Sequence, residues 1–143
     1  MTASRSDIEH RVRDLVNGER THARLQALRD DDRLSAVARA HSEDMARRRF
    51  FSHVNPSGED PTARGRRAGY ECRRILGDVI RVGLAENLYE ASGTARDDIE
   101  HRSVEGWMKS PGHRANILEK NYSRTGVGVA VAGGAIYITQ LFC

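Results

Sequence analysis

Two β-rich runs separated by a glycine pair constrain the fold of this chain more than any other feature. The runs are residues 125–131 and 136–142, and Gly133-Gly134 lies between them. Strand-forming runs on either side of a two-glycine turn predict a β-hairpin. Both runs are apolar on both faces, which is typical of strands inside a sheet. We therefore expect the two strands to occupy central positions.

Helix signals dominate the first part of the chain. Ser6 and Glu9 have the spacing of a capping box, and apolar residues recur at helical intervals after them, which predicts a first helix over residues 7–20. The acidic run 30–32 suits the N-terminus of a second helix. The apolar stripe of that helix consists of Leu34, Val37, Ala38, His41, Met45 and Ala46.

The middle of the chain predicts shorter elements. The Asp-Pro step at 60–61 marks the start of a short helix over residues 61–68. Residues 78–89 carry a mixed pattern, and we expect an irregular segment with some β structure there. An aspartate pair at 97–98 can open a third long helix, which the Ser-Pro-Gly run at 110–112 stops.

Gly126 and Gly128 alternate with valines in the first run of the hairpin. No lysine follows them and no helix opens there, which argues against a phosphate-binding loop. Glycines at alternate positions leave bare backbone on one face of a strand. We therefore expect a helix to pack closely against that face.

Length and composition place the chain among single globular domains. It has 143 residues, of which 38% are hydrophobic and 30% charged, so we expect one domain over residues 1–143. The formal net charge is +3, and the arginines are scattered among acids without interleaved aromatics. That pattern favours a solvated basic face over a nucleic-acid site. The sequence contains neither a transmembrane segment nor a signal-peptide pattern.

The chain has two cysteines, Cys72 and Cys143, which lie far apart and lack a Cys-x-x-Cys pairing. This spacing argues against a metal knuckle or a redox motif. A disulfide between them is compatible with the sequence, but a chain of this size folds on its core alone. We therefore expect two free thiols.

A histidine follows an aromatic pair at the end of the second predicted helix. Phe50-Phe51 closes the apolar stripe, and residues 52–58 are dense in turn formers. We expect the aromatic pair to be buried and to hold His53 in a fixed position on its loop.

Six sequence blocks occur in one order along the chain. They read AHSEDM (40–45), FFSH (50–53), AENL (85–88), WMKSPGHRANIL (107–118), GVG (126–128) and YITQ (137–140). Together they resemble the CAP superfamily of cysteine-rich secretory, antigen 5 and pathogenesis-related proteins, in its compact prokaryotic form, over nearly the whole chain. The resemblance implies an α+β fold, a three-layer α/β/α sandwich with a small antiparallel sheet between helices.

The resemblance also implies a cleft lined by two histidines and two glutamates. Position by position, the family pattern assigns His53, Glu86 and His113 to this cleft. Ser110 stands where the second glutamate is found in animal and plant members, so the set of four is incomplete. Three neighbouring residues are further cleft candidates, with packing or backbone hydrogen bonding as their alternative roles: Asn87, Gln140 and His41.

The three assigned residues suit a weak metal site. Two neutral imidazoles can hold Zn²⁺, so His53 and His113 with Glu86 are the candidate ligands. Glu86 would orient an imidazole or accept a proton from bound water. The alternative is a hydrogen-bonded cluster without metal that ties a loop, a strand and a helix start together.

Several functions remain open. The leading hypothesis is a non-enzymatic, monomeric binding module that acts at or outside the cell surface on a protein, cell-wall or lipid partner. A metal-dependent or serine hydrolase would use the same cleft with Ser52 or Ser110, although neither serine lies in a Gly-x-Ser-x-Gly turn. A lipid or sterol carrier is the third hypothesis. The resemblance implies secretion or attachment to the cell envelope, with the cytoplasm as the alternative.

Overall fold

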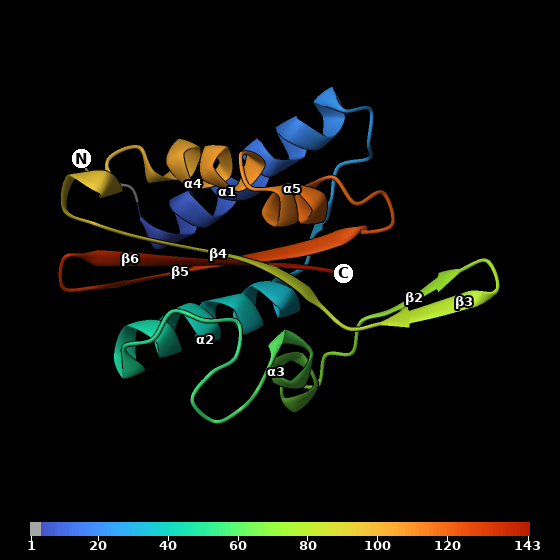
Figure 1. The fold of residues 1–143 in the computed structure, drawn as a ribbon, viewed down its shortest axis with the longest axis horizontal. Helices are drawn as coiled ribbons and strands as arrows, with labels where there is room; N and C mark the ends of the chain where they lie inside the picture. The colour runs from blue at the N-terminus through green and yellow to red at the C-terminus, as the bar shows by residue number, and fades with distance from the viewer. Residues whose placement is uncertain (1–3) are drawn as a thin grey trace.

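A four-stranded sheet in the order β1-β5-β6-β4 lies between two layers of helices in the computed structural model, which describes residues 4–143 (Figure 1). Strands β5 (Arg124–Ala132) and β6 (Ala135–Phe142) form the central antiparallel hairpin. Strand β4 (Ala85–Ser92) pairs with β6 at one edge, and β1 (Arg29–Asp30) pairs in parallel with β5 at the other. The predicted hairpin, its central position and the α+β sandwich are confirmed.

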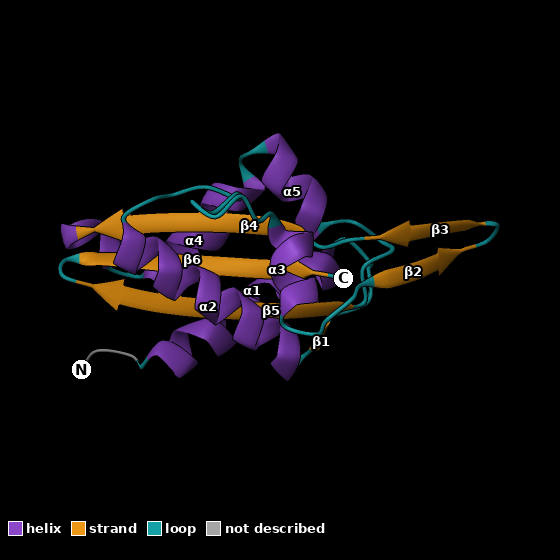
Figure 2. Cartoon of the chain, turned by 90° about the horizontal axis from the view of Figure 1, so that it is seen from below, coloured by secondary structure: helices purple, strands orange, loops and turns teal. Residues whose placement is uncertain are grey.

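Helices cover both faces of the sheet (Figures 1 and 2). One layer contains α1 (Arg5–His22), α4 (Ile99–Met108) and α5 (Pro111–Ile117), and the 3₁₀ turn η1 (Gly93–Arg96) leads from β4 toward α4. The other layer contains α2 (Asp32–Arg48) and α3 (Pro61–Arg67). The Ser-Pro-Gly run at 110–112 therefore stops one helix and starts the next.

Each face of the sheet has its own apolar core, which explains why β6 is apolar at successive positions. Ile136, Ile138 and Phe142 of β6 belong to the core under α1, α4 and α5. Leu141 belongs to the core under α2. Alternate side chains of one strand point to opposite faces, so a central strand needs apolar residues at both sets of positions.

Helix α1 begins two residues earlier than its sequence predicts, and the expected capping box of Ser6 and Glu9 is wrong. Ser4 is the N-cap, and its hydroxyl accepts from the backbone N–H of Asp7 at 3.1 Å while the Asp7 carboxylate accepts in return. Glu9 is instead buried under the helix. It accepts from the backbone N–H of Val129 at 2.9 Å and pairs with Arg39, so it joins α1 to β5 and α2.

Helix α2 packs directly onto the backbone of β5, as the two glycines predict. A Cβ atom at Gly126 would overlap the backbone of Ser35, and one at Gly128 would overlap the backbone of Arg39. Ser42 of α2 also donates to the carbonyl of Gly128 at 2.9 Å. The glycines therefore set the distance between this helix and the sheet.

The segment expected to be irregular contains regular strands. Strands β2 (Arg73–Leu76) and β3 (Val79–Val82) form a separate two-stranded hairpin, and β4 follows directly. The pattern was obscured in β4 because this edge strand turns the polar side chains of Glu86 and Asn87 inward among side chains that bond them. Figure 2 shows the β2–β3 hairpin projecting from one end of the molecule.

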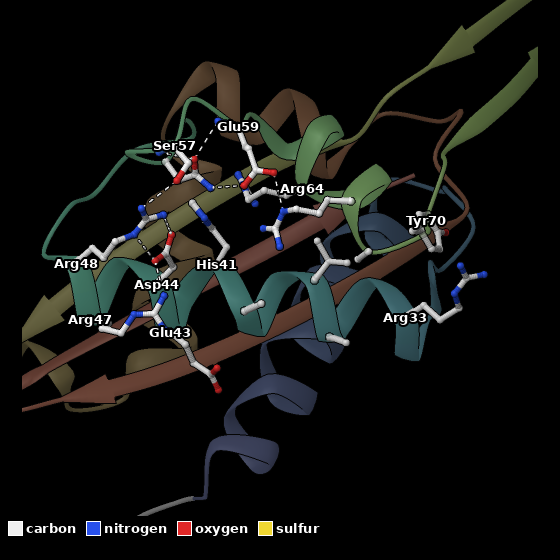
Figure 3. Close-up of a pocket in the computed structure, with 16 residues that line it drawn as sticks. Arg33, His41, Glu43, Asp44, Arg47, Arg48, Ser57, Glu59, Arg64 and Tyr70 are labelled. Atoms are coloured by element: carbon white, nitrogen blue, oxygen red, sulfur yellow. Dashed lines mark hydrogen bonds and ion pairs between the residues drawn. The ribbon is translucent and has the colours of Figure 1, made fainter.

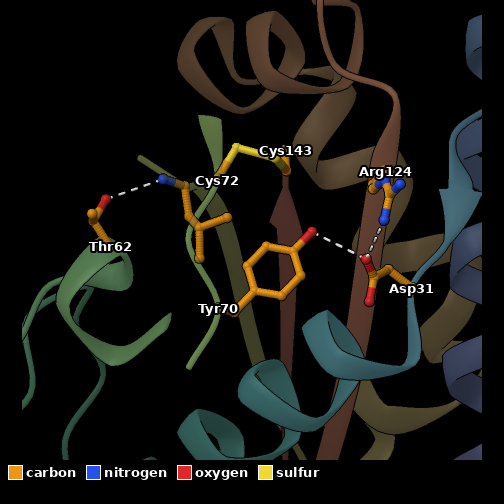
Figure 4. The surroundings of a disulfide bond; sticks show 7 residues. Asp31, Thr62, Tyr70, Cys72, Arg124 and Cys143 are labelled. Atoms are coloured by element: carbon orange, nitrogen blue, oxygen red, sulfur yellow. Dashed lines mark hydrogen bonds and ion pairs between the residues drawn. A yellow bond between two sulfur atoms is a disulfide. The ribbon is translucent and has the colours of Figure 1, made fainter. Parts of the chain in front are cut away.

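Cys72 and Cys143 form a disulfide bond, so the expectation of free thiols is wrong (Figure 4). Both cysteines are buried, one at the base of the β2–β3 hairpin and the other directly after β6. Their proximity comes from the fold and is invisible in the sequence spacing of 71 residues. A cross-link that closes a loop of this length restricts the unfolded chain by about 4 kcal/mol in the loop-entropy estimate.

None of the helices within residues 4–143 has the length and apolar character needed to cross a bilayer.

A methyl group at Gly128 tests the close contact between α2 and β5. We expect Gly128→Ala to lower the free energy of unfolding by about 3 kcal/mol, because the Cβ atom forces the helix away from the strand. Gly134→Ala is the matched control, since a Cβ there meets nothing within 4 Å. Chemical denaturation measures both variants, and equal stability of the two would contradict this account of the packing.

Candidate functional site

His53 and Glu86 meet at the exposed edge of the sheet. The loop after α2 carries His53, whose side chain is 53% exposed, and β4 carries Glu86, whose side chain is 1% exposed. The Nδ1 atom of His53 lies 2.8 Å from Oε1 of Glu86. An ionised carboxylate can only accept, so the imidazole donates from Nδ1. This bond leaves the Nε2 lone pair of a neutral His53 free.

The carboxylate of Glu86 is also held by a buried arginine. Arg64 on α3 is 4% exposed, and its Nη2 atom donates to Oε1 of Glu86 at 3.0 Å and lies 2.9 Å from Oε2. The same Nη2 atom donates to the backbone carbonyl of His53 at 2.7 Å. Arg64 therefore fixes both the glutamate and the loop that carries the histidine.

His113 approaches the same edge from the other helix layer. It lies in the first turn of α5, and its Nδ1 atom is 2.8 Å from the hydroxyl of Ser110. Burial lowers the pKa of His113, and the nearby charge of His53 lowers it further. The backbone carbonyl of His113 accepts from Asn87, the residue after Glu86, so both histidines contact neighbouring positions of β4. The Ser110 contact leaves Nε2 of His113 outside this bond.

Two asparagines tie α5 to β4 beneath His113. Asn116 donates to Oδ1 of Asn87 at 2.9 Å, and Asn87 donates to the backbone carbonyl of His113 at 3.1 Å. Asn87 is fully buried. Its contacts are those of a residue that positions the helix start and hence the imidazole.

His41 lies behind the site rather than at its surface. Its side chain is fully buried on α2, its Nε2 atom lies 2.9 Å from the backbone carbonyl of Ser52, and its ring packs edge-on against Phe50. Burial lowers the pKa of His41, and this effect outweighs the opposing charge of Glu86. His41 thus supports the His53 loop as a neutral side chain.

Two expectations about the surroundings of His53 are changed by the structure. Phe51 is 46% exposed, so the aromatic pair is not a buried anchor, and Glu86 and Arg64 hold the loop instead. Gln140 is buried on the sheet face that it shares with Asn87, and its amide donates to the hydroxyl of Thr125 at 2.9 Å. This contact ties Gln140 to the hairpin and not to the imidazoles.

Sequence reasoning missed Arg64 and the groove that it borders. A groove of about 910 Å³ lies between α2 and α3, and its lining includes His41, Arg64 and Tyr70 (Figure 3). Ion pairs lie along its walls, including Arg48 with Asp44 on α2 and Arg67 of α3 with Glu59. His41 and Arg64 therefore separate this charged groove from the His53 site. The recurrence of charges along the exposed side of the second predicted helix is the signal that could have indicated it.

The donor set around the imidazoles is limited. Within residues 4–143, no three side chains of histidine, cysteine, aspartate or glutamate converge with the spacing of metal ligands. Glu86 is already bonded to Arg64 and His53. The carboxylate named as a candidate ligand is therefore held by other side chains of the protein.

Known families account for this arrangement of elements and residues. The sequence model of the cysteine-rich secretory protein family, CAP, matches residues 13–142. The chain belongs to the CAP family. The matched range includes every residue of the polar cluster at the edge of β4, which consists of His41, His53, Arg64, Glu86, Asn87 and His113.

This CAP domain is similar to several bacterial proteins. YkwD of Bacillus subtilis is 33% identical over 138 residues, which cover 96% of this chain and 48% of YkwD. An extracellular protein of Bacillus anthracis that contains an SCP domain superposes with a TM-score of 0.73 at 28% identity, over 96% of this chain and 40% of that one. An outer surface protein of Borrelia burgdorferi gives 0.77 at 18% identity, over 99% and 96% of the two chains.

The extent of these matches differs. The CAP domain spans about half the length of YkwD and less than half of the Bacillus anthracis protein. It matches nearly the full length of the Borrelia protein, but at that identity the likeness concerns the fold alone.

The pairing of Arg64 with Glu86 predicts a large loss when the cation alone is removed. Arg64→Met should lower the free energy of unfolding by about 3 kcal/mol, because the buried carboxylate loses its charge partner. The double variant Arg64→Met/Glu86→Gln should be more stable than Arg64→Met. Arg66→Met is the control, since its half-exposed ion pair with Glu71 should contribute less than about 1 kcal/mol.

Chemical denaturation provides these values. The single variant Glu86→Gln completes the comparison. If the loss of stability in the double variant equalled the sum of the losses in Arg64→Met and Glu86→Gln, Arg64 and Glu86 would act independently, contrary to the geometry.

Because His41 is buried with a lowered pKa, we expect the free energy of unfolding to fall on acidification. Its folded-state pKa is below the unfolded value of about 6.5, so the unfolded chain takes up the proton first. The stabilisation is complete above that value and is lost as the pH falls through the lowered folded pKa. We expect the free energy of unfolding to decrease from pH 7.5 to 5.5, and to decrease less in His41→Gln. His10→Gln on the surface of α1 should retain the full decrease.

Denaturation curves at each pH measure this dependence. An identical pH dependence in the wild type and His41→Gln would exclude His41 as its source.

Proposed function

We propose that this CAP domain is a non-enzymatic binding module that acts at or outside the cell surface, and that His53 and His113 together hold a divalent cation weakly. The observation that carries the proposal is the state of the two imidazoles. Each has its Nδ1 atom engaged, by Glu86 in one case and Ser110 in the other, so each Nε2 lies outside these bonds and can act as a ligand when Nδ1 carries the ring proton. Hydrogen bonding at one ring nitrogen is the usual way in which proteins orient a histidine ligand.

The electrostatics support cation binding near neutral pH. The lowered pKa of His113 keeps this imidazole neutral, and a neutral imidazole is the form that coordinates metal. The donor set fits a two-imidazole zinc site rather than a catalytic one, because catalytic zinc is held by three protein ligands. A bound ion would supply open coordination positions for an acidic group of a partner.

Exposed apolar residues beside the imidazoles extend the proposed contact surface. Phe51 and Val54 flank His53 and are each nearly half exposed. An apolar rim around a polar centre suits a protein, cell-wall or lipid partner at this position. The description of the Bacillus anthracis protein as extracellular supports a site of action outside the cell.

The hydrolase hypothesis rests on the contact between Ser110 and His113. Serine and imidazole lie at hydrogen-bond distance, but the serine bonds to Nδ1, and the nearby acid Glu86 is bonded to His53 and Arg64. A Ser-His-acid triad needs the acid on the second nitrogen of the same imidazole. The charged lining of the groove between α2 and α3 likewise gives no support to a lipid carrier. The binding module is therefore preferred.

Zinc titration by calorimetry tests the cation site. We expect the wild type to bind Zn²⁺ with modest affinity, and His53→Ala or His113→Ala to weaken binding by at least about tenfold. His10→Ala removes a surface histidine of α1 and should bind as the wild type does.

Two results would contradict the proposal. Binding heat that persists unchanged in His53→Ala would remove the cation site. Turnover of an ester or peptide that disappears in His113→Ala, with the fold intact, would replace the binding module by an enzyme.

A further inference from the structure

The β2–β3 hairpin is an arm that leaves the body of the molecule (Figures 1 and 2). Its strands, Arg73–Leu76 and Val79–Val82, pair only with each other among the described residues and are joined by a turn at Gly77-Asp78. An isolated two-stranded hairpin in water gains little stability of its own. Packing within the hairpin therefore does not explain why its side chains are apolar.

One face of the hairpin is aliphatic and open to solvent. Ile75 and Ile80 are cross-strand partners and are 74% and 51% exposed, and Val82 on the same face is 55% exposed. Val79 lies on the opposite face and is 49% exposed. Single exposed aliphatic residues are ordinary, but a contiguous group of them marks an interaction surface.

Basic residues border this aliphatic face. Arg73 pairs across the strands with Val82 on the same face, and Arg81 projects from the other face. Both arginines are exposed. Glu71, the acid that precedes the hairpin, pairs instead with Arg66 at 3.6 Å. The arm therefore presents positive charge beside its aliphatic side chains, with Asp78 confined to the turn.

The base of the hairpin is anchored on several sides. Cys72, the residue before β2, is bonded to Cys143 after β6, and the N–H of Gly83 donates to the carbonyl of Cys72 at 3.0 Å (Figure 4). The guanidinium of Arg74 lies 4.7 Å from the centre of the Tyr122 ring. The exposed face is thus presented on a fixed support rather than on a loose loop.

We propose that the face formed by Ile75, Ile80, Val82 and Arg73 binds the surface of an anionic lipid bilayer. The aliphatic side chains enter the boundary between headgroups and acyl chains, and Arg73 on the same face contacts lipid phosphates. Arg81 on the opposite face adds positive charge close to the anionic surface. Asp78 and the unpaired strand edges favour a hairpin that lies flat, because backbone groups at the interface stay in contact with water.

Charge distinguishes this occupant from a second copy of the chain. Two hairpins packed through the aliphatic face would bring Arg73 of both copies into one interface, and like charges in contact oppose association. An anionic surface provides the complementary sign. The proposal is independent of the imidazole pair, which lies at the edge of β4 and not on the arm.

Sedimentation with vesicles tests the proposal on the disulfide-bonded chain in buffer that contains a chelator. We expect binding to vesicles of phosphatidylglycerol mixed with phosphatidylcholine, and much weaker binding to phosphatidylcholine alone. Ile75→Ser/Ile80→Ser should lower the partition coefficient on the order of tenfold or more. Arg73→Gln/Arg81→Gln should lower it about 25-fold, because each basic residue near an anionic surface adds a factor of roughly five.

The controls separate the arm from the rest of the molecule. Val131→Ser removes an aliphatic side chain that is 43% exposed on β5, and it should bind as the wild type does. His53→Ala/His113→Ala should also bind normally, so failure of the cation site leaves this result unaffected. Circular dichroism checks that each variant is folded, as expected for substitutions at exposed positions.

Three results would overturn the proposal. The first is that the wild type fails to bind anionic vesicles, and the second is that it binds anionic and neutral vesicles equally. The third is that analytical ultracentrifugation shows a dimer that the Ile75→Ser/Ile80→Ser variant no longer forms, which would make this face a contact between two copies of the chain.

Discussion

The buried carboxylate of Glu86 is the group on which the arrangement of the site depends. A charge with almost no exposure to water is tolerated in a fold only when its partners replace the lost solvation. Arg64 and His53 do so here, and they come from a helix and a loop that contact the sheet edge at this point. One ionised group thereby positions α3, the loop after α2 and β4 relative to one another. The same bond fixes which nitrogen of His53 faces outward.

Periodicity and turn chemistry made much of the fold predictable. The apolar runs around Gly133-Gly134 predicted the central hairpin, and the two glycines of β5 predicted the contact with α2. The family resemblance named His53, Glu86 and His113; in the structure His53 bonds to Glu86 of β4, and the backbone of His113 bonds to Asn87 of the same strand. The turn and glycine patterns involve residues close together in the chain, and the family resemblance rests on sequence blocks in a fixed order. Both can therefore be recognised in the sequence alone.

The features that were missed depend on distant contacts. Arg64 is one of many scattered arginines in the sequence, and its role follows from the direction in which α3 faces the sheet. The Cys72–Cys143 bond requires the end of β6 to lie beside the base of the β2–β3 hairpin. Strand β4 was hidden because its inward polar residues break the apolar pattern. The capping box was misplaced because Ser4 with Asp7 and Ser6 with Glu9 have the same spacing, and only the second acid is needed elsewhere.

The disulfide separates the residues of the polar cluster into those inside and those outside the covalent ring that it closes. It closes a covalent ring from Cys72 to Cys143 that contains Glu86 and His113, whereas His41, His53 and Arg64 precede the ring. The hydrogen bonds that Glu86 makes with His53 and Arg64 therefore join the closed part of the chain to the open part. Breaking these bonds would separate His53 from Glu86 and His113 while leaving the ring intact, so the site is complete only when the two parts are docked on each other.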